Sequence, residues 1–235
     1  MKITLLGQAT FLIECAGQKV LSDPYFGTWG NPAFTRVRPP AVRREDAPKP
    51  DLVLVSHNHW DHIDGPYLRL LGKDVPVLTP YLSQKVTRLL GAKTTIGLKA
   101  WQSMRFGELT VTAVPAVHLT STIGFVIEGE GQAIYFAGDT FYHDFMVEIG
   151  RRFTLAAALI PVTTFRIPMT MGEQGALRAV QALRPQRVIP MHLDVQPRLP
   201  LLCTNHSVAG FKQRVLAAGL DPQVVELTNG QSLEI

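Results

Sequence analysis

The first part of the chain consists of short, mostly apolar stretches separated by turn residues. Residues 2–6, 10–15 and 19–22 have this character, and Ala16-Gly17-Gln18 supplies a turn between the last two. Short apolar runs of this length, bounded by turn residues, predict strands. Because the connections are short, we expect the three strands to form a meander.

Further strands are predicted where short apolar runs lie between turn residues. They cover residues 52–55, 75–79, 109–117, 123–128, 132–137 and 155–162. The last of these is continuously apolar, which indicates a buried strand. At the end of the chain, Val224–Leu227 and Ser232–Ile235 flank Asn229-Gly230, a pair that predicts a hairpin turn.

Helical segments separate many of these strands. Asp64 is a candidate N-cap for a helix that begins there, because a short carboxylate can accept a hydrogen bond from a free backbone N–H group. A second helix is predicted over Ser83–Leu90, closed by Gly91, and another over residues 207–218. Pattern alone therefore indicates a mixed α/β fold.

A β-α-β unit is predicted in the second half of the chain. Thr170 and Glu173 have the spacing of a capping box, and apolar residues follow them at helical intervals. Pro185 ends this helix, and residues 187–190 return as a strand that leads to His192.

Composition indicates one folded domain. The 235 residues, of which 46% are hydrophobic and 18% charged, can bury a substantial core, and we expect residues 1–235 to form a single domain. No apolar run approaches the roughly 20 residues that span a bilayer, and Gly7, Gln8 and Glu14 interrupt the only N-terminal run that resembles a signal peptide. Two cysteines form no disulfide framework, so we expect a cytoplasmic protein without a membrane partner.

The charge balance is mildly basic. The formal net charge is +4, from 23 basic and 19 acidic residues, which is weaker than that of a typical nucleic-acid-binding protein. A local excess lies in the proline-rich connection 24–50, where Arg36, Arg38, Arg43, Arg44 and Lys49 outnumber the acidic residues. Such a segment is either a solvated loop or an anion-binding surface, and the sequence leaves both interpretations open.

One hexapeptide carries most of the chemical information. Residues 57–62 read His-Asn-His-Trp-Asp-His and directly follow the apolar run 52–55. His57 and His59 share a face if the strand continues, while Asp61 and His62 lie where the chain must turn. Imidazole and carboxylate groups together suit zinc, iron or manganese. The cluster therefore predicts a metal site at the end of a strand.

Other candidate site residues also follow predicted strands. Asp23 follows the meander, His118 follows residues 109–117, Asp139 follows residues 132–137, and His192 follows residues 187–190. Separate strand ends can deliver side chains to one edge of a sheet, so we expect these residues to meet.

These motifs resemble the metallo-β-lactamase superfamily, whose central signature is H-x-H-x-D-H after an apolar strand. The resemblance spans nearly the whole chain. It implies a four-layer αββα sandwich, with two mixed sheets packed face to face, helices on both outer faces, and metals at one edge. Within the superfamily, Ala137-Gly138-Asp139-Thr140 and Pro190-Met191-His192 are similar to small bacterial hydrolases related to ascorbate-6-phosphate lactonase. Many of those relatives have His where this chain has Gln8.

The number of candidate ligands favours two ions. A single catalytic zinc ion needs three protein ligands and a water, whereas this chain offers seven candidates. The resemblance implies that the first ion is held by His57, His59 and His118, the second by Asp61, His62 and His192, with Asp139 bridging. We expect two divalent ions, zinc first and manganese or iron as alternatives. Asp23 is expected to orient a ligand from outside the centre.

Three functions are compatible with such a centre. The favoured one is a binuclear hydrolase in which a hydroxide bridging the metals attacks a small ester, lactone or amide, with or without a phosphate group, while Asp61 orients the nucleophile as the catalytic residue. We expect a small-molecule substrate of anionic character. The alternative is a phosphodiesterase acting on nucleotides or nucleic acid, and the third is a non-hydrolytic metal protein. Asp139 stands where true β-lactamases have a metal-binding cysteine, which disfavours antibiotic hydrolysis.

Some chemically active residues have no assigned role. His143 and His206 are candidates for a general acid or for structural positions. Cys15 is predicted to share a buried strand face with Phe11 and Ile13. The sequence leaves the substrate and any homo-oligomeric state open.

Overall fold

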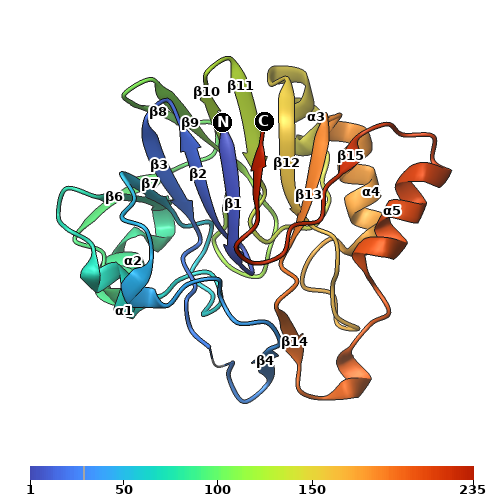
Figure 1. Ribbon diagram of the computed structural model, residues 1–235, viewed down its shortest axis with the longest axis horizontal. Coiled ribbons are helices and arrows are strands. Elements are labelled where there is room, and N and C mark those ends of the chain that lie inside the picture. Colours follow the sequence, from blue (N-terminus) through green and yellow to red (C-terminus); the bar gives the residue numbers. More distant parts are fainter. Residues whose placement is uncertain (29) are drawn as a thin grey trace.

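The computed structural model describes residues 1–28 and 30–235, and in it two β-sheets pack face to face with helices on their outer surfaces (Figure 1). This is the expected αββα sandwich. The two ends of the chain lie beside each other, where the last strand joins the first sheet (Figure 1).

The first sheet has the strand order β16-β1-β2-β3-β5-β6-β7. Its strands are β16 (Ser232–Glu234), β1 (Lys2–Gly7), β2 (Thr10–Cys15), β3 (Gln18–Ser22), β5 (Leu52–Leu54), β6 (Pro76–Pro80) and β7 (Thr94–Leu98). The antiparallel meander β1-β2-β3 is confirmed, and β3, β5, β6 and β7 run parallel. The sheet is therefore mixed.

The second sheet has the order β15-β13-β12-β11-β10-β9-β8. Its strands are β15 (Gln223–Val224), β13 (Arg187–Met191), β12 (Leu155–Pro161), β11 (Gln132–Phe136), β10 (Ile123–Gly129), β9 (Leu109–Pro115) and β8 (Ser103–Phe106). Strands β8 to β11 are antiparallel, and β11, β12, β13 and β15 are parallel. As a result, β9, β11 and β13 all end at the same edge.

Helices cover both outer faces (Figure 1). Helices α1 (Gly65–Leu70) and α2 (Gln84–Leu90) lie on the first sheet, and α3 (Phe145–Arg152), α4 (Gly172–Leu183) and α5 (Val208–Ala217) lie on the second. Short 3₁₀ turns occur at Arg44–Asp46, Tyr81–Ser83 and Pro200–Leu202. The side chain of Asp64 accepts from the backbone N–H of Tyr67, which confirms it as the N-cap of α1. No helix among the described residues is both long enough and apolar enough to cross a membrane.

Strand β2 shows how the sequence pattern builds two apolar layers. Phe11, Ile13 and Cys15 point between the sheets, where they join Phe125 of β10, as the alternation predicts. Leu12 points the other way, into a smaller cluster beneath α1. The edge-to-face pair of Phe11 and Phe136, with ring centroids 6.4 Å apart, joins the two sheets directly.

Two sequence predictions are wrong. The residues around Asn229-Gly230 do form a turn, with the Gln231 N–H donating to the Thr228 carbonyl, but β15 pairs with β13 in one sheet and β16 pairs with β1 in the other. The turn therefore carries the chain from sheet to sheet. The capping box at α4 is also absent, because the Thr170 hydroxyl donates to the Thr163 carbonyl and Glu173 accepts from the Ser207 N–H group instead.

The proline-rich connection 24–50 contributes a small ribbon near the metal ligands. Its strand β4 (Phe34–Arg36) pairs antiparallel with β14 (Val195–Pro197), which follows β13 directly. In Figure 1 this ribbon projects from the lower edge of the sandwich, at the end where β13 delivers His192. Neither strand was expected from the sequence.

Candidate metal centre

The seven predicted ligands come together at one edge of the sandwich. His57, His59, His118 and Asp139 form one group, and Asp61, His62 and His192 form another, with the ligand atoms of each group within 4.8 Å of one another. We call His57, His59 and His118 the first ligand set, and Asp61, His62 and His192 the second ligand set. The parallel strands of the two sheets explain the convergence, because the loops that follow them leave from the same edge.

Asp139 lies between the two sets. Its Oδ2 is 3.3 Å from Nε2 of His192 and 3.8 Å from Nε2 of His118, and its Oδ1 is 3.4 Å from Nε2 of His62. Within the sets, His118 Nε2 is 3.1 Å from His59 Nδ1, and His192 Nε2 is 3.2 Å from Asp61 Oδ2. One carboxylate thus faces both groups of ligands.

Gly138 permits this close approach. It has φ of +59°, and a Cβ atom at this position would lie 2.5 Å from Cβ of Ser56. Any other residue would be strained by the backbone angle and by the contact. The glycine therefore lets the loop carrying Asp139 pack directly against the loop that begins with His57.

Asp23 fixes the orientation of two ligand rings. Its fully buried carboxylate accepts from the Ser56 N–H group at 2.6 Å, from the Ser56 hydroxyl at 2.6 Å and from Nδ1 of His62 at 2.7 Å. Because the Ser56 proton goes to Asp23, the Ser56 oxygen accepts from Nδ1 of His57, 2.9 Å away. In both histidines Nδ1 is thereby the donor, and Nε2 faces the centre as the atom that would bind a metal.

The buried atoms of the centre fit divalent cations. Among the described residues, three buried atoms that face the centre have no hydrogen-bond partner, namely His57 Nε2, His62 Nε2 and Asp139 Oδ1. Buried polar atoms without partners are uncommon because each costs free energy. Imidazole nitrogens and carboxylate oxygens that converge in this way are the donors that zinc, iron and manganese use.

Burial and charge affect the two sets differently. Burial lowers the pKa of all three first-set histidines: His57 well below its ordinary value, His59 less far, and His118 to about 4. Burial also opposes protonation of His62 and His192, but the carboxylates of Asp139 and Asp61 outweigh it and raise both pKa values. The first set is therefore neutral and ready to bind at neutral pH, whereas at His62 and His192 protons compete more strongly with a cation.

The comparisons with known proteins agree with this geometry. A family model described as a β-lactamase superfamily domain matches residues 18–193. The chain is 34% identical over 251 residues to a UPF0173 metal-dependent hydrolase of Pelotomaculum thermopropionicum, and 30% identical over 246 residues to one of Methanopyrus kandleri, with 100% of each chain covered in both cases. The chain belongs to the metal-dependent hydrolases of the β-lactamase superfamily.

Solved structures show the same fold. A metallo hydrolase of Ignicoccus hospitalis has a TM-score of 0.78 and 28% identity, and the match covers 100% of this chain and 98% of the other. An isothiocyanate hydrolase from Delia radicum gut bacteria has a TM-score of 0.82 at 21% identity, covering 100% and 99%. The diiron β-hydroxylase CmlA of Streptomyces venezuelae has a TM-score of 0.76 at 17% identity, and the match covers 100% of this chain and 54% of CmlA. The last two likenesses show the fold alone.

Two residues that the sequence did not identify as part of the site connect its loops. Gln8, with φ of +55°, donates from Nε2 to Asp61 Oδ2 at 2.9 Å, and its Oε1 accepts from the Asp194 N–H group. Its backbone carbonyl accepts from the N–H of His192, and Asp194 in turn accepts from the N–H of Gln8. In this hydrolase, Gln8 therefore ties the loop of Asp61 to the loop of His192. The resemblance marks Gln8 only as a position where many relatives have His, and a single glutamine in a turn has no pattern of its own that signals this role.

The metal pocket is small and has apolar walls. We use this name for a cavity of about 220 Å³ whose polar lining residues are ligands: His59, Asp61, Asp139 and His192. Its remaining lining residues are Phe34, Trp60, Phe165, Met169 and Val195. The ribbon of β4 and β14 contributes two of these walls, so the proline-rich connection helps to shape the pocket.

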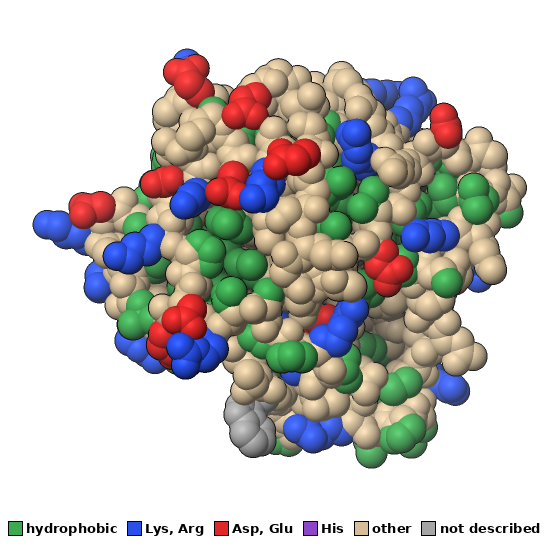
Figure 2. Space-filling model, viewed as in Figure 1, with side chains coloured by type: hydrophobic (Ala, Val, Ile, Leu, Met, Phe, Trp, Pro, Cys, Tyr) green, Lys and Arg blue, Asp and Glu red, His purple; other side chains and the backbone are tan. Residues whose placement is uncertain are grey.

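The basic residues of that connection mostly pair within the chain. Arg36 and Arg38 both contact Asp194, Arg43 contacts Asp46, and Arg44 contacts Asp64. Arg36 is buried and also donates to backbone carbonyls. On the face shown in Figure 2, acidic and basic side chains are interspersed. These contacts leave the segment less able to bind phosphates than its charge count suggests.

The unassigned histidines lie outside the two ligand groups. His143 is exposed before α3, where its ring stacks on Phe145 at a centroid distance of 5.3 Å. His206 borders a separate polar cavity together with Cys203. Cys203 and Cys15 are both free thiols, and Cys15 is buried as predicted.

Proposed function

We propose that this hydrolase holds two divalent ions, zinc by preference, and cleaves a small ester, lactone or amide. The number and grouping of the ligands support two ions, because a single catalytic ion uses about three protein ligands. Asp139 faces both ligand sets at 3.3–3.8 Å and is suited to bridge them.

Two bound ions would lower the pKa of a water between them, supply hydroxide at neutral pH and stabilise the negative charge that develops during hydrolysis. The side chains of the pocket perform the remaining tasks. Asp61 borders the pocket, and His62 and His192 outweigh the effect of burial and hold its pKa low. Asp61 is therefore an ionised carboxylate that can accept a hydrogen bond from a water molecule. Gln8 holds Asp61 in place by donating to Oδ2. We propose that Asp61 thereby orients the attacking water.

The metal pocket is the observation that favours a small substrate. Its volume of about 220 Å³ and its aromatic and aliphatic walls suit a compact apolar group beside the bond to be cleaved. No lysine or arginine is among the described residues that line it. A negative charge on the substrate would therefore be met by the metal ions, and we propose that the rest of the substrate is apolar.

Phosphodiester cleavage is the less favoured function. Binding of a nucleic-acid backbone releases counterions at each phosphate contact and needs unpaired basic side chains. Four arginines of the connection 24–50 make ion pairs within the chain. The pocket and these pairs together support the small-molecule substrate.

Activity on a substrate panel tests the proposal. Zinc-loaded protein is assayed on short carboxylic esters, lactones, amides and a phosphodiester over increasing salt. We expect ester or lactone turnover that changes little with salt and that falls strongly in Asp61→Asn, while Asp51→Asn, an exposed carboxylate that caps the N–H of Lys19, serves as the matched control. Full activity in Asp61→Asn would remove its proposed role. Efficient phosphodiester cleavage that declines steeply with salt would favour the nuclease.

A further inference from the structure

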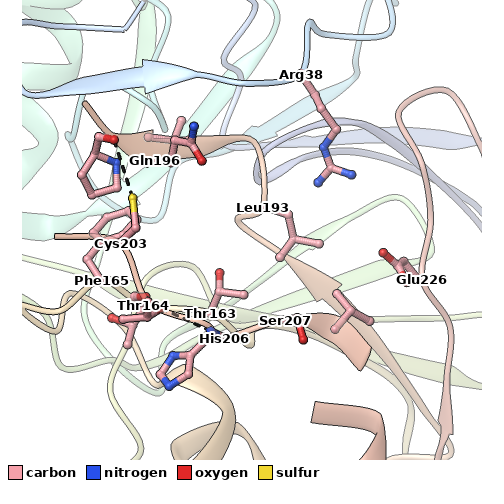
Figure 3. A pocket seen from close by; sticks show the side chains of 14 residues that line it. Arg38, Thr163, Thr164, Phe165, Leu193, Gln196, Cys203, His206, Ser207 and Glu226 are labelled. Carbon is pink, nitrogen blue, oxygen red and sulfur yellow. Dashed lines mark hydrogen bonds between the residues drawn. The ribbon is translucent and has the colours of Figure 1, made fainter. Parts of the chain in front are cut away.

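A second cavity lies beside the metal pocket. This polar cavity has a volume of about 270 Å³ and is bordered by hydroxyl groups of Thr163, Thr204 and Ser207. In Figure 3, Arg38 and Glu226 approach it from one side and Phe165 from the other. None of the residues assigned to metal binding lines it.

Phe165 and Val195 line both cavities, so they form the wall between them. The two residues differ in how firmly they are held. Val195 is buried in β14, where its backbone pairs with Arg36 of β4. Phe165 lies in the loop after β12 and is half-buried, with its ring 5.3 Å from that of Phe34. The ring of Phe165 is the part of the wall that a substitution can remove without breaking a strand.

The backbone around Phe165 is fixed independently of its ring. The Thr164 hydroxyl accepts from the N–H groups of Met169 and Thr170 at 2.9 and 3.2 Å, which closes the loop. The Thr164 carbonyl accepts from the Thr204 hydroxyl at 2.6 Å. These bonds do not involve the Phe165 side chain, so a shorter side chain at this position leaves the loop anchored.

We propose that Phe165 determines the length of the substrate that the metal centre accepts, by closing the metal pocket against the polar cavity. The inference deepens the proposed function, because it specifies a substrate whose acyl group is short and apolar. A group that extends past Phe165 would enter a cavity lined with hydroxyl, guanidinium and carboxylate groups, where apolar atoms would cover polar atoms that need partners.

Binding of alkyl hydroxamic acids tests this inference without requiring turnover. Hydroxamates chelate metal ions, so their affinity for zinc-loaded protein reports on access to the pocket even if no ester is hydrolysed. Calorimetric dissociation constants are measured for acetohydroxamic acid and for longer straight-chain homologues up to decanohydroxamic acid. The variants are Phe165→Ala, the milder Phe165→Leu, and Ile167→Ala as a control on the same loop, since Ile167 is 65% exposed and lines neither cavity.

In the unmodified protein we expect affinity to rise by about fourfold for each buried methylene and then to stop rising once the chain reaches Phe165. Phe165→Ala should bind acetohydroxamic acid within twofold of the unmodified protein but bind the first homologues beyond the length limit at least tenfold more tightly, because their methylenes fill the space that the ring leaves, with Phe165→Leu between them. A terminal hydroxyl on the long chain should add affinity only in the alanine variant, because only there does it reach the polar cavity. Ile167→Ala should match the unmodified protein.

The same length limit in Phe165→Ala as in the unmodified protein, or no limit in either, would overturn the role of Phe165. If the length limit shifts as expected but no ester, lactone or amide is hydrolysed, the proposed function is wrong while the wall between the cavities is real. Circular dichroism and zinc content of each variant distinguish a changed pocket from a misfolded protein.

Discussion

Replacing Asp23 with Asn changes one atom of a buried side chain and leaves all seven ligands in place. The carboxylate now accepts from two groups of Ser56 and from Nδ1 of His62, at 2.6–2.7 Å. Both carboxylate oxygens accept hydrogen bonds, so in either orientation of the asparagine amide its NH₂ group would lie against a donor of Ser56 or His62. Loss of one charge-assisted hydrogen bond costs about 1.5–3 kcal/mol.

The cost should fall mainly on metal binding, because the lost bond is the one that holds a ligand ring in its metal-binding orientation. Outer partners of this kind typically contribute roughly 10- to 100-fold to metal affinity. We expect Asp23→Asn to weaken zinc binding by about this factor. The second ligand set should be affected more, because it contains His62, whereas Asp23 reaches the first set only through Ser56. Turnover at limiting zinc should fall in parallel.

Competition with a chromophoric chelator measures both zinc affinities, and circular dichroism shows whether the fold is intact. Asp51→Asn is the matched control, because Asp51 also accepts a backbone N–H bond but is exposed and accepts it from Lys19, which is neither a candidate ligand nor a partner of one. Unchanged zinc affinity in folded Asp23→Asn would refute the reasoning that the Asp23 hydrogen bonds orient the ligands.

Three further predictions concern stability, thiol reactivity and pH. Gln8→Ala should lower the free energy of unfolding of the metal-free protein by about 2–4 kcal/mol, since Asp61 loses a donor and the buried Asp194 N–H loses its acceptor. Urea titration measures this free energy, and a loss below about 0.5 kcal/mol would contradict the prediction. Cys203 should react with a thiol reagent in the folded protein, whereas Cys15, whose pKa burial raises to about 11, should react only after unfolding. On acidification, zinc should leave the second ligand set first. The histidines of that set have raised pKa values and take up protons at a higher pH than those of the first set. The absorbance of a chelator that captures released zinc, recorded as the pH is lowered, checks this order.

Local patterns in the sequence are sufficient to predict that the candidate ligands converge, because these residues follow strands. Parallel strands deliver their C-terminal ends to one edge, and the apolar runs before His57, His118 and His192 identify those strands without any knowledge of the fold. The same local signal failed at Asn229-Gly230. A turn dipeptide fixes the direction of the backbone, but it carries no information about which strands the flanking residues will pair with.

Elements that depend on distant contacts were also missed. Helix α3 buries Met146 and Ile149 against the second sheet, too few apolar positions to give a periodic signal of their own. The ribbon of β4 and β14 forms between segments about 160 residues apart, and Asp194, which exchanges two hydrogen bonds with Gln8, lies 186 residues away from it. The walls of the metal pocket come from such contacts, which is why the shape of the pocket follows from the structure and not from the motifs.

The number of metal ions per chain tests the central claim most directly. Protein purified without chelator, reconstituted with excess zinc and freed of loosely bound metal is analysed for zinc and for protein, with His192→Ala as a variant that removes one ligand of the second set. Two groups of ligands on either side of Asp139 predict about two ions per chain, and about one in His192→Ala. A ratio that stays at one in the unmodified protein, under zinc or manganese in excess, would contradict the binuclear centre.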